Sequence, residues 1–294
     1  MKLRIGTRRS RLALAQAREV ADRLAAIGIE SELVPMVTSG DLGAPSTASP
    51  AGVKGLFVAE IVRALQDGEV DLAVHSAKDL PAHDDEGVVI AAVPPRADPS
   101  DLLVTRDGVL PSGATVGTSS VRRRAQILRW RRDVLVADLR GNVDTRLRKL
   151  EEGEVDAAVL AAAGLARLGL APSHAEWLPI VPAPGQGSLA VQARTAEMGT
   201  RGVVAALDHT DSHAALDAER SLMALLGGGC DLPLGAHATV DADGVRMVAI
   251  VATPDGERLV RVEVEAGSPE DAAERAAAQL LTEGAGDILD AVRR

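Results

Sequence analysis

The sequence predicts two α/β domains followed by a small α+β domain. Three observations predict this fold class. Short β-like runs alternate with helical patterns over most of the chain, a turn-rich stretch (VPPRADPSD, 93–101) interrupts the alternation, and the order of elements changes after about residue 209. Alternating strands and helices are typical of βαβ units. A length of 294 residues also exceeds what one hydrophobic core usually fills, so more than one domain is expected.

The first domain follows from the periodicity of its apolar residues. The stretch between its second strand and second helix, GAPSTASPAG at 43–52, is of low complexity and predicts a loop. In order, we expect strands over 2–6, 31–37 and 70–75 and helices over 10–28 and 55–68.

Beyond the turn-rich stretch, the alternation of strands and helices resumes. Strands are expected over 115–118, 134–139 and 155–161, each followed by a helix that begins near Ser119, Asn142 and Ala161 respectively. The last domain then contains a helix over 214–226, strands within 235–266 that are separated by Asp-Gly turns, and a helix over 268–284.

The charge of the chain is distributed unevenly. Residues 122–149 hold nine arginines and one lysine against three aspartates, a local charge of +7 in a chain whose net charge is −10. This segment predicts binding of an anion. The acidic remainder repels a long polyanion but admits a small one, and three aromatic side chains (Phe57, Trp130, Trp177) offer few stacking surfaces for bases. We therefore expect a small anionic ligand and no nucleic acid.

The remaining composition favours a cytoplasmic protein. No run approaches the roughly 18 apolar residues of a membrane span, and the basic start of the chain lacks the apolar region of a signal peptide, so no membrane association is expected. One cysteine forms neither an internal disulfide nor, by itself, a zinc site. His209 and His213 have a spacing that metal sites use, but an exposed helix start is the favoured interpretation, and no metal is expected.

Four turns that follow strands carry basic or hydroxyl side chains. In parallel sheets, ligands bind beyond the carboxyl ends of the strands, where helix N-termini present free N–H groups. In the third turn, Ser119 or Ser120 can cap a helix while Arg122 and Arg123 lie in its first turn, so that several donors converge on one anion. Helix caps and solvated arginines remain the alternative for any single turn. The four turns are GTRRS (6–10), HSAKD (75–79), GTSSVRRR (117–124) and LRGNVDTR (139–146).

The single cysteine, Cys230, follows three glycines at 227–229. Glycines have no Cβ atoms, so a bulky electrophile can approach the thiol. The alternative is a buried, inert cysteine that packs as a small hydrophobic residue. Cys230 is therefore a candidate for covalent attachment of a ligand.

Eight segments occur in the order, and nearly the spacing, of one enzyme family. They are GTRRSRLALAQA, VKGLFVAEI, DLAVHSAKDLP, VGTSSVRRRAQ, LRGNVDTRLRKL, AAAGLARLGL, PGQGSLAV and GGGCDLPLGAHA. Over about residues 4–281, the chain resembles the hydroxymethylbilane synthase family, also called porphobilinogen deaminases. The resemblance implies two doubly wound domains, similar to periplasmic binding proteins and facing a cleft, and a third domain with a three-stranded antiparallel sheet. The implied boundaries are 1–94 with 188–205, 100–181, and 210–294.

The resemblance also implies the chemistry. The family condenses four porphobilinogen molecules head to tail, with loss of ammonia, into linear hydroxymethylbilane in tetrapyrrole biosynthesis. Each porphobilinogen carries an acetate and a propionate, which suits the arginine-rich segment. A dipyrromethane cofactor is attached by a thioether to the family's cysteine, hence to Cys230. Asp79 is the implied catalytic residue, which stabilises the cation left by deamination and transfers protons.

The resemblance further assigns a set of residues to the carboxylates of cofactor and substrate or to the shape of the cleft. These are Arg8, Ser10, Lys54, Ser76, Lys78, Thr118, Ser119, Ser120, Arg122, Arg123, Arg140, Asn142, Arg146, Arg167 and Gln186.

One departure and one alternative remain. Gln192 occupies a position where the family commonly has glutamate, so a charge pair there is not expected. The alternative function is that of a two-domain cytoplasmic binding protein for a small polycarboxylate, which suits basic strand ends but needs no thiol. We expect a monomer.

Overall fold

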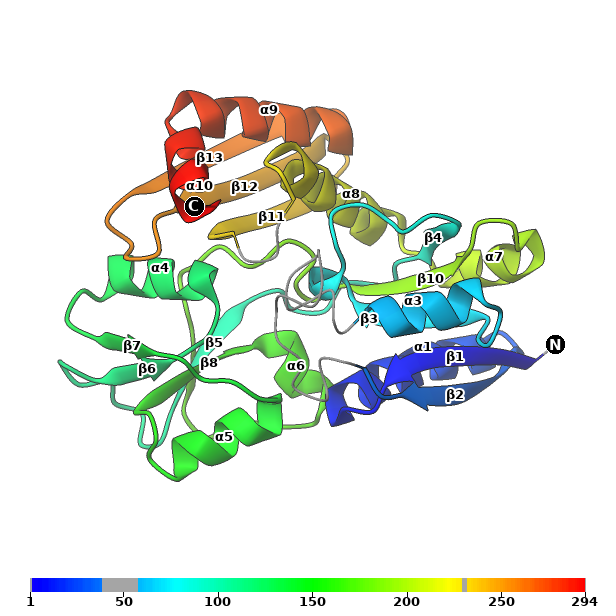
Figure 1. The fold of residues 1–294 in the computed structure, drawn as a ribbon, viewed down its shortest axis with the longest axis horizontal. Coiled ribbons are helices and arrows are strands. Elements are labelled where there is room, and N and C mark those ends of the chain that lie inside the picture. The colour runs from blue at the N-terminus through cyan, green and yellow to red at the C-terminus, as the bar shows by residue number, and fades with distance from the viewer. Residues whose placement is uncertain (1, 39–57, 229–231, 294) are drawn as a thin grey trace.

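The computed structural model describes residues 2–38, 58–228 and 232–293. These residues form two five-stranded mixed sheets and one three-stranded antiparallel sheet (Figure 1). The two larger sheets lie side by side, and the third sheet, with its helices, lies above them in Figure 1.

The first sheet has the strand order β2-β1-β3-β10-β4. β1 is parallel to β2 and β3, whereas β10 is antiparallel to both of its neighbours. The strands are β1 (Lys2–Arg8), β2 (Glu30–Met36), β3 (Leu72–Ser76), β4 (Val88–Ala92) and β10 (Leu189–Arg194).

Helices cover both faces of this sheet, as expected of a doubly wound domain. α1 (Arg11–Ala26) packs on one face through Ala17, Val20 and Leu24. α3 (Ala59–Gln66) packs on the other face. Ser10 caps α1 by accepting a hydrogen bond from the Ala13 amide, so the helix begins directly after β1. The short elements of this part are η2 (Ala77–Asp79), α7 (Met198–Val204) and η3 (Ala205–Leu207).

The second sheet repeats the plan of the first, with the order β7-β6-β8-β5-β9 and β5 antiparallel to its neighbours. β6 is parallel to β7 and β8. Its strands are β5 (Asp101–Thr105), β6 (Thr115–Gly117), β7 (Leu135–Ala137), β8 (Ala157–Ala161) and β9 (Ala175–Trp177), and its helices are α4 (Val121–Trp130), α5 (Val143–Glu151) and α6 (Ala162–Arg167).

The third sheet packs against helices that precede and follow it, mainly through alanine, valine and leucine side chains. Its elements are α8 (Thr210–Leu225), β11 (Leu234–Asp241), β12 (Gly244–Ala252), β13 (Leu259–Ala266), α9 (Pro269–Thr282) and α10 (Ala285–Arg293). The three sheets confirm the predicted fold class, but strands β4, β5 and β9 and helices α7 and α10 were not among the expected elements. The predicted domain boundaries stay a prediction.

Two segments, 93–100 and 178–188, join the first two sheets. They touch where the Ala97 amide donates to the Gly187 carbonyl at 3.3 Å. Gly187 has a φ of +92°, and a Cβ there would lie 2.3 Å from the Ala97 oxygen. Only glycine therefore allows this crossing.

A buried ion pair connects the crossing segments to the third sheet. The Arg96 guanidinium donates to both carboxylate oxygens of Glu219 on α8, at 2.7 and 3.1 Å. Glu219 is 0% exposed and also accepts from the amides of Gly185 and Ala238. One carboxylate thus holds both crossing segments against β11.

Replacing Glu219 with glutamine removes the charge and leaves Arg96 buried without a counter-ion. Loss of one partner of a buried pair costs about 3–5 kcal/mol, and we expect the free energy of unfolding to fall by that amount. Chemical denaturation measures it. The control is Glu263→Gln, whose salt bridge with Arg246 lies at the surface and should matter little. Equal effects of the two substitutions would contradict a structural role for Glu219.

Candidate active site

The predicted site residues follow the carboxyl ends of strands in both larger sheets. Arg8 ends β1, and η2 brings Lys78 and Asp79 directly after β3. In the second sheet, Ser120 caps α4 by accepting from the Arg123 amide, and Asn142 precedes α5. Ser120, one of the two caps that the sequence indicated, thus marks the start of α4, whereas Asn142 makes no capping side-chain hydrogen bond.

Asp101, at the start of β5, binds both arginines at the N-terminus of α4. Its carboxylate lies 2.8 Å from Arg122 Nη1 and 2.7 Å from Arg123 Nη2. All three side chains are buried. Burial alone raises the pKa of Asp101, but the two guanidinium charges outweigh it and hold the pKa below its ordinary value. Arg122 and Arg123 therefore share an internal counter-ion, which the sequence did not indicate.

Gln186 connects this cluster to the first sheet. Its amide nitrogen donates to Asp101 at 2.9 Å and to the Pro99 carbonyl at 2.6 Å. Its oxygen accepts from Lys78 Nζ at 3.5 Å. Gln186 is 1% exposed, so it is a fixed link between η2 and the start of β5.

Arg146 lies on α5, and the charges of Asp79 and Arg123 both affect its pKa. Burial lowers its pKa most, Arg123 lowers it further and Asp79 raises it, to a value of about 10. Its Nε donates to the Gly141 carbonyl at 2.8 Å. Arg146 therefore stays charged at neutral pH while partly removed from water, and charges from both sheets converge around it.

His75, on β3, is buried near Asp79 and Arg8. Burial lowers its pKa to about 4, with Asp79 raising and Arg8 lowering it, and its Nε2 is buried without a hydrogen-bond partner among the described residues. His75 is therefore neutral at neutral pH. Next to it along β3, Ser76 Oγ accepts from the Gln16 amide at 2.6 Å.

Arg167, on α6, has partners of its own. Its Nε donates to Glu19 on α1 at 2.9 Å, and its Nη2 donates to the Gly187 carbonyl at 3.1 Å. Arg167 thus joins the second sheet's helices to the first.

Other predicted residues take different positions. Arg140 is exposed and lies 3.6 Å from the Asp138 carboxylate, and Asn142 is also exposed. Thr118 is buried, and its Oγ1 accepts from the Ser120 amide at 3.2 Å. Lys54 and Cys230 lie outside the described residues. The structure therefore groups most of the predicted set, with Arg140 and Asn142 at its solvent edge.

The residues on either side of the cysteine's segment can be placed. A Cβ at Gly228 would lie 3.3 Å from the Ala82 side chain, and Leu232 packs in the same apolar cluster as Ala82. Ala82 follows Asp79 by three residues.

Two further observations concern metal sites and membrane spans. Among the described residues, no group of three or more acidic, histidine or cysteine side chains is placed to hold a metal ion. Within the same residues, no helix is both long and apolar enough to cross a bilayer. His209 caps α8 through its ring, as the helix-start interpretation predicted.

Sequence reasoning missed Asp101, Gln16 and His75. Asp101 is the last residue of the turn-rich stretch 93–101, and no motif in its neighbouring sequence marks it as a site residue. An aspartate at an expected domain crossing, in a chain with two adjacent arginines at a helix start, is the one signal that could have indicated it.

Comparison with known proteins identifies the family of the chain. Residues 3–201 match the family model described as porphobilinogen deaminase, dipyromethane cofactor binding domain, and residues 213–282 match porphobilinogen deaminase, C-terminal domain. The chain is 44% identical to a porphobilinogen deaminase of Brevibacillus brevis, over 100% of this chain and 98% of the relative. It is 46% identical to that of Pelotomaculum thermopropionicum, over 100% and 97% respectively. Among solved structures, an ancestral arginine-binding protein bound to arginine covers 70% of this chain and 90% of its own, with 17% identity and a TM-score of 0.40. With two matching domain models and relatives of this identity over its full length, the chain belongs to the porphobilinogen deaminase family.

Proposed function

We propose that the charged residues at the strand ends of the two larger sheets direct the condensation of four porphobilinogen molecules into hydroxymethylbilane, with release of ammonia. The observation that carries this assignment is the convergence of Asp79, from the first sheet, with Arg146 and Arg123, from the second. A cluster of cations around one carboxylate suits substrates that bring two carboxylates each and form a cation during the reaction. No observation favours the binding-protein alternative.

The residues present fit the family's dipyrromethane cofactor. Ser119 Oγ and Arg122 Nε are buried donors without a partner among the described residues, and buried polar groups normally have one. Carboxylates of a bound group can accept from both donors. When bound, the cofactor supplies the pyrrole carbon to which substrate units are added. We assign its attachment to Cys230, since Gly228 lies against Ala82, three residues after Asp79, and Leu232 belongs to the same apolar cluster as Ala82.

Asp79 is the proposed catalytic residue. Its carboxylate accepts pyrrole N–H hydrogen bonds, offsets positive charge on the substrate and passes a proton to the leaving amine. Arg146 holds a substrate carboxylate beside it through charge-assisted hydrogen bonds. Lys78, Arg8 and Ser10 serve the same purpose from the first sheet, and Thr118, Ser119 and Ser120 from the second. Ser76 lies within this set.

The buried arginines have a double role in this proposal. Arg122 and Arg123 each give part of their guanidinium to Asp101, which fixes their positions. Arg123 Nη1 also donates to the Val159 carbonyl and Arg122 Nη1 to the Val181 carbonyl, so the donor left for a cofactor or substrate carboxylate is Arg122 Nε. Gln186 connects Lys78 to this cluster, because it accepts from Lys78 and donates to Asp101. Arg167 holds a carboxylate near α1. Arg140 and Asn142, which are exposed, complete the set, and we keep Lys54 in it on the family resemblance.

We also assign the chain to the cytoplasm as a monomer. The single cysteine supports a reducing compartment, because an attachment thiol must stay free of disulfides until it is alkylated.

Asp79→Asn should reduce turnover by a hundredfold or more while the protein still folds. Asparagine keeps the size of the side chain but not its charge, and loss of an electrostatic stabiliser typically costs about that much. Porphobilinogen consumption measures the rate, and thermal unfolding monitors the fold. The control is Asp85→Asn, an exposed aspartate nearby, which should behave as wild type. Near-normal turnover of Asp79→Asn excludes the catalytic role.

Intact mass spectrometry tests the attachment site. The purified wild-type chain should be heavier than its sequence by two deaminated pyrrole units, and Cys230→Ser should lack that increment and the activity. An active wild-type chain with the unmodified mass contradicts the cofactor assignment.

Arg146→Leu should raise the KM for porphobilinogen by about tenfold or more, because a partly desolvated, charge-assisted contact to a carboxylate is worth roughly 1.5–3 kcal/mol. Initial rates over a range of substrate concentrations measure this change. Arg148→Leu, on the same helix, removes only a surface pair with Glu152 and is the matched control. Indistinguishable kinetics of the two variants would show that Arg146 is merely solvated.

A further inference from the structure

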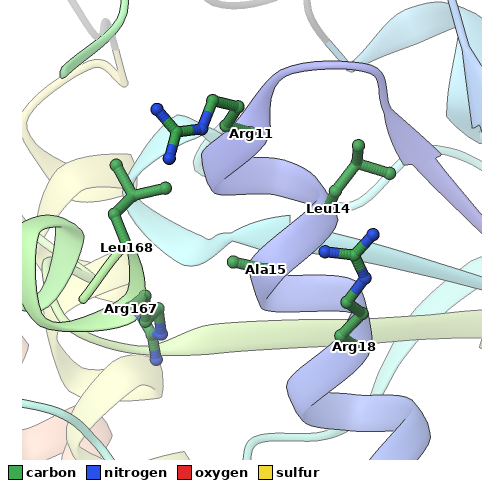
Figure 2. Close-up of a pocket in the computed structure, with 6 residues that line it drawn as sticks. All are labelled: Arg11, Leu14, Ala15, Arg18, Arg167 and Leu168. Carbon is green, nitrogen blue, oxygen red and sulfur yellow. The ribbon is translucent and has the colours of Figure 1, made fainter. Parts of the chain in front are cut away.

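A pocket of about 320 Å³ lies between α1 and α6. Figure 2 shows Arg11, Leu14, Ala15 and Arg18 along one face of α1, with Arg167 and Leu168 opposite them. The α1 residues recur at the three- to four-residue spacing of one helix face. None of the six lining residues is acidic.

The pocket adjoins the proposed substrate site. Arg11 follows Ser10, the cap of α1, and Arg8 ends the preceding strand. On the other side, Arg167 donates to the carbonyl of Gly187, the residue after Gln186. The pocket and the proposed substrate site therefore share Arg167 as a common border.

The charge of the pocket is not balanced internally. Within the part of the chain that the structure describes, Arg11 and Arg18 form no salt bridge and no side-chain hydrogen bond, and both are exposed. Glu19, the nearest acid along α1, binds Arg23 and Arg167 instead. Two uncompensated guanidinium groups, with a third held beside them by Glu19, favour an anion.

The walls indicate what kind of anion fits. Leu14, Ala15 and Leu168 supply apolar surface between the arginines. A ligand with a flat apolar ring and two carboxylates matches both features. The volume lies at the lower end of the range for small-molecule sites, about 300–1,000 Å³, and suits one pyrrole ring with its acid side chains.

We infer that this pocket is a subsite for an outer ring of the growing polypyrrole chain, filled through the ring's acetate and propionate after positions nearer Asp79 are occupied. This inference rests on the proposed function and adds Arg11 and Arg18 to the residues that bind substrate. They act late, because the first added ring is held beside Arg146 and Asp79.

The test is a double charge reversal, Arg11→Glu with Arg18→Glu, in the cofactor-loaded enzyme. Under limiting porphobilinogen, native gels and intact masses resolve enzyme carrying one to four added rings. We expect the first ring to be added at a rate within about twofold of wild type, with accumulation of chains of two or three rings and turnover lowered on the order of tenfold. The double lysine variant, which keeps both charges, should restore the wild-type distribution.

The control is Arg63→Glu, an exposed arginine of α3 that does not line the pocket. It should leave the distribution unchanged. A wild-type distribution in the double glutamate variant overturns the inference, as does an equal change in Arg63→Glu. Failure of the wild-type enzyme to add any ring overturns the proposed function instead, so the two failures are distinguishable.

Discussion

The arrangement of the site depends on one buried carboxylate, that of Asp101. It lies where the chain first enters the second sheet and binds the two arginines at the start of α4. Loss of one partner from a buried ion pair costs about 3–5 kcal/mol, so each of these three groups stabilises the others. Because Gln186 donates to Asp101 and accepts from Lys78 at 3.5 Å, the same carboxylate is linked to Lys78 in the first sheet. The positions of the side chains at these strand ends therefore depend on the Asp101 cluster, which forms within the protein and requires no ligand.

This cluster also decides which positive charges can act on an anion. The local excess of +7 in residues 122–149 suggests a uniformly basic surface. In the structure, Asp101 offsets part of the charge of Arg122 and Arg123, and Asp133 and Glu152 pair with Arg131 and Arg148 at the surface. Arg146 has no such acid within hydrogen-bonding distance among the described residues. Within this segment, we therefore expect carboxylates to bind most strongly at Arg146, whose positive charge no hydrogen-bonded acid among the described residues neutralises.

The sequence predicted the features that local chemistry determines. Ser10, Ser120 and Ser268 cap helices where the pattern placed them, and the Asp-Gly pairs at 243–244 and 255–256 connect the strands of the third sheet. It predicted neither strand β5 nor the antiparallel direction of β5 and β10, because strand pairing and direction depend on partners distant in sequence. Asp101 was missed for the same reason: its importance comes from arginines more than twenty residues away. The grouping of Asp79 with Arg146 followed from family resemblance, not from spacing.

The contacts between the two larger sheets differ in strength. At the crossing segments, Gly187 lies against Ala97, and Asp101 and Glu219 are 0% exposed, so separation there would uncover two buried acids and their partners. At the α1–α6 contact, the Glu19–Arg167 pair is partly exposed, with the Glu19 side chain 29% accessible. Water can replace a partly exposed pair at little cost, whereas it cannot easily replace a buried one. A ligand that gains two carboxylates with each ring is therefore accommodated more cheaply beside α1 and α6 than at the crossing, which is also where the chain keeps two arginines without acidic partners among its described residues.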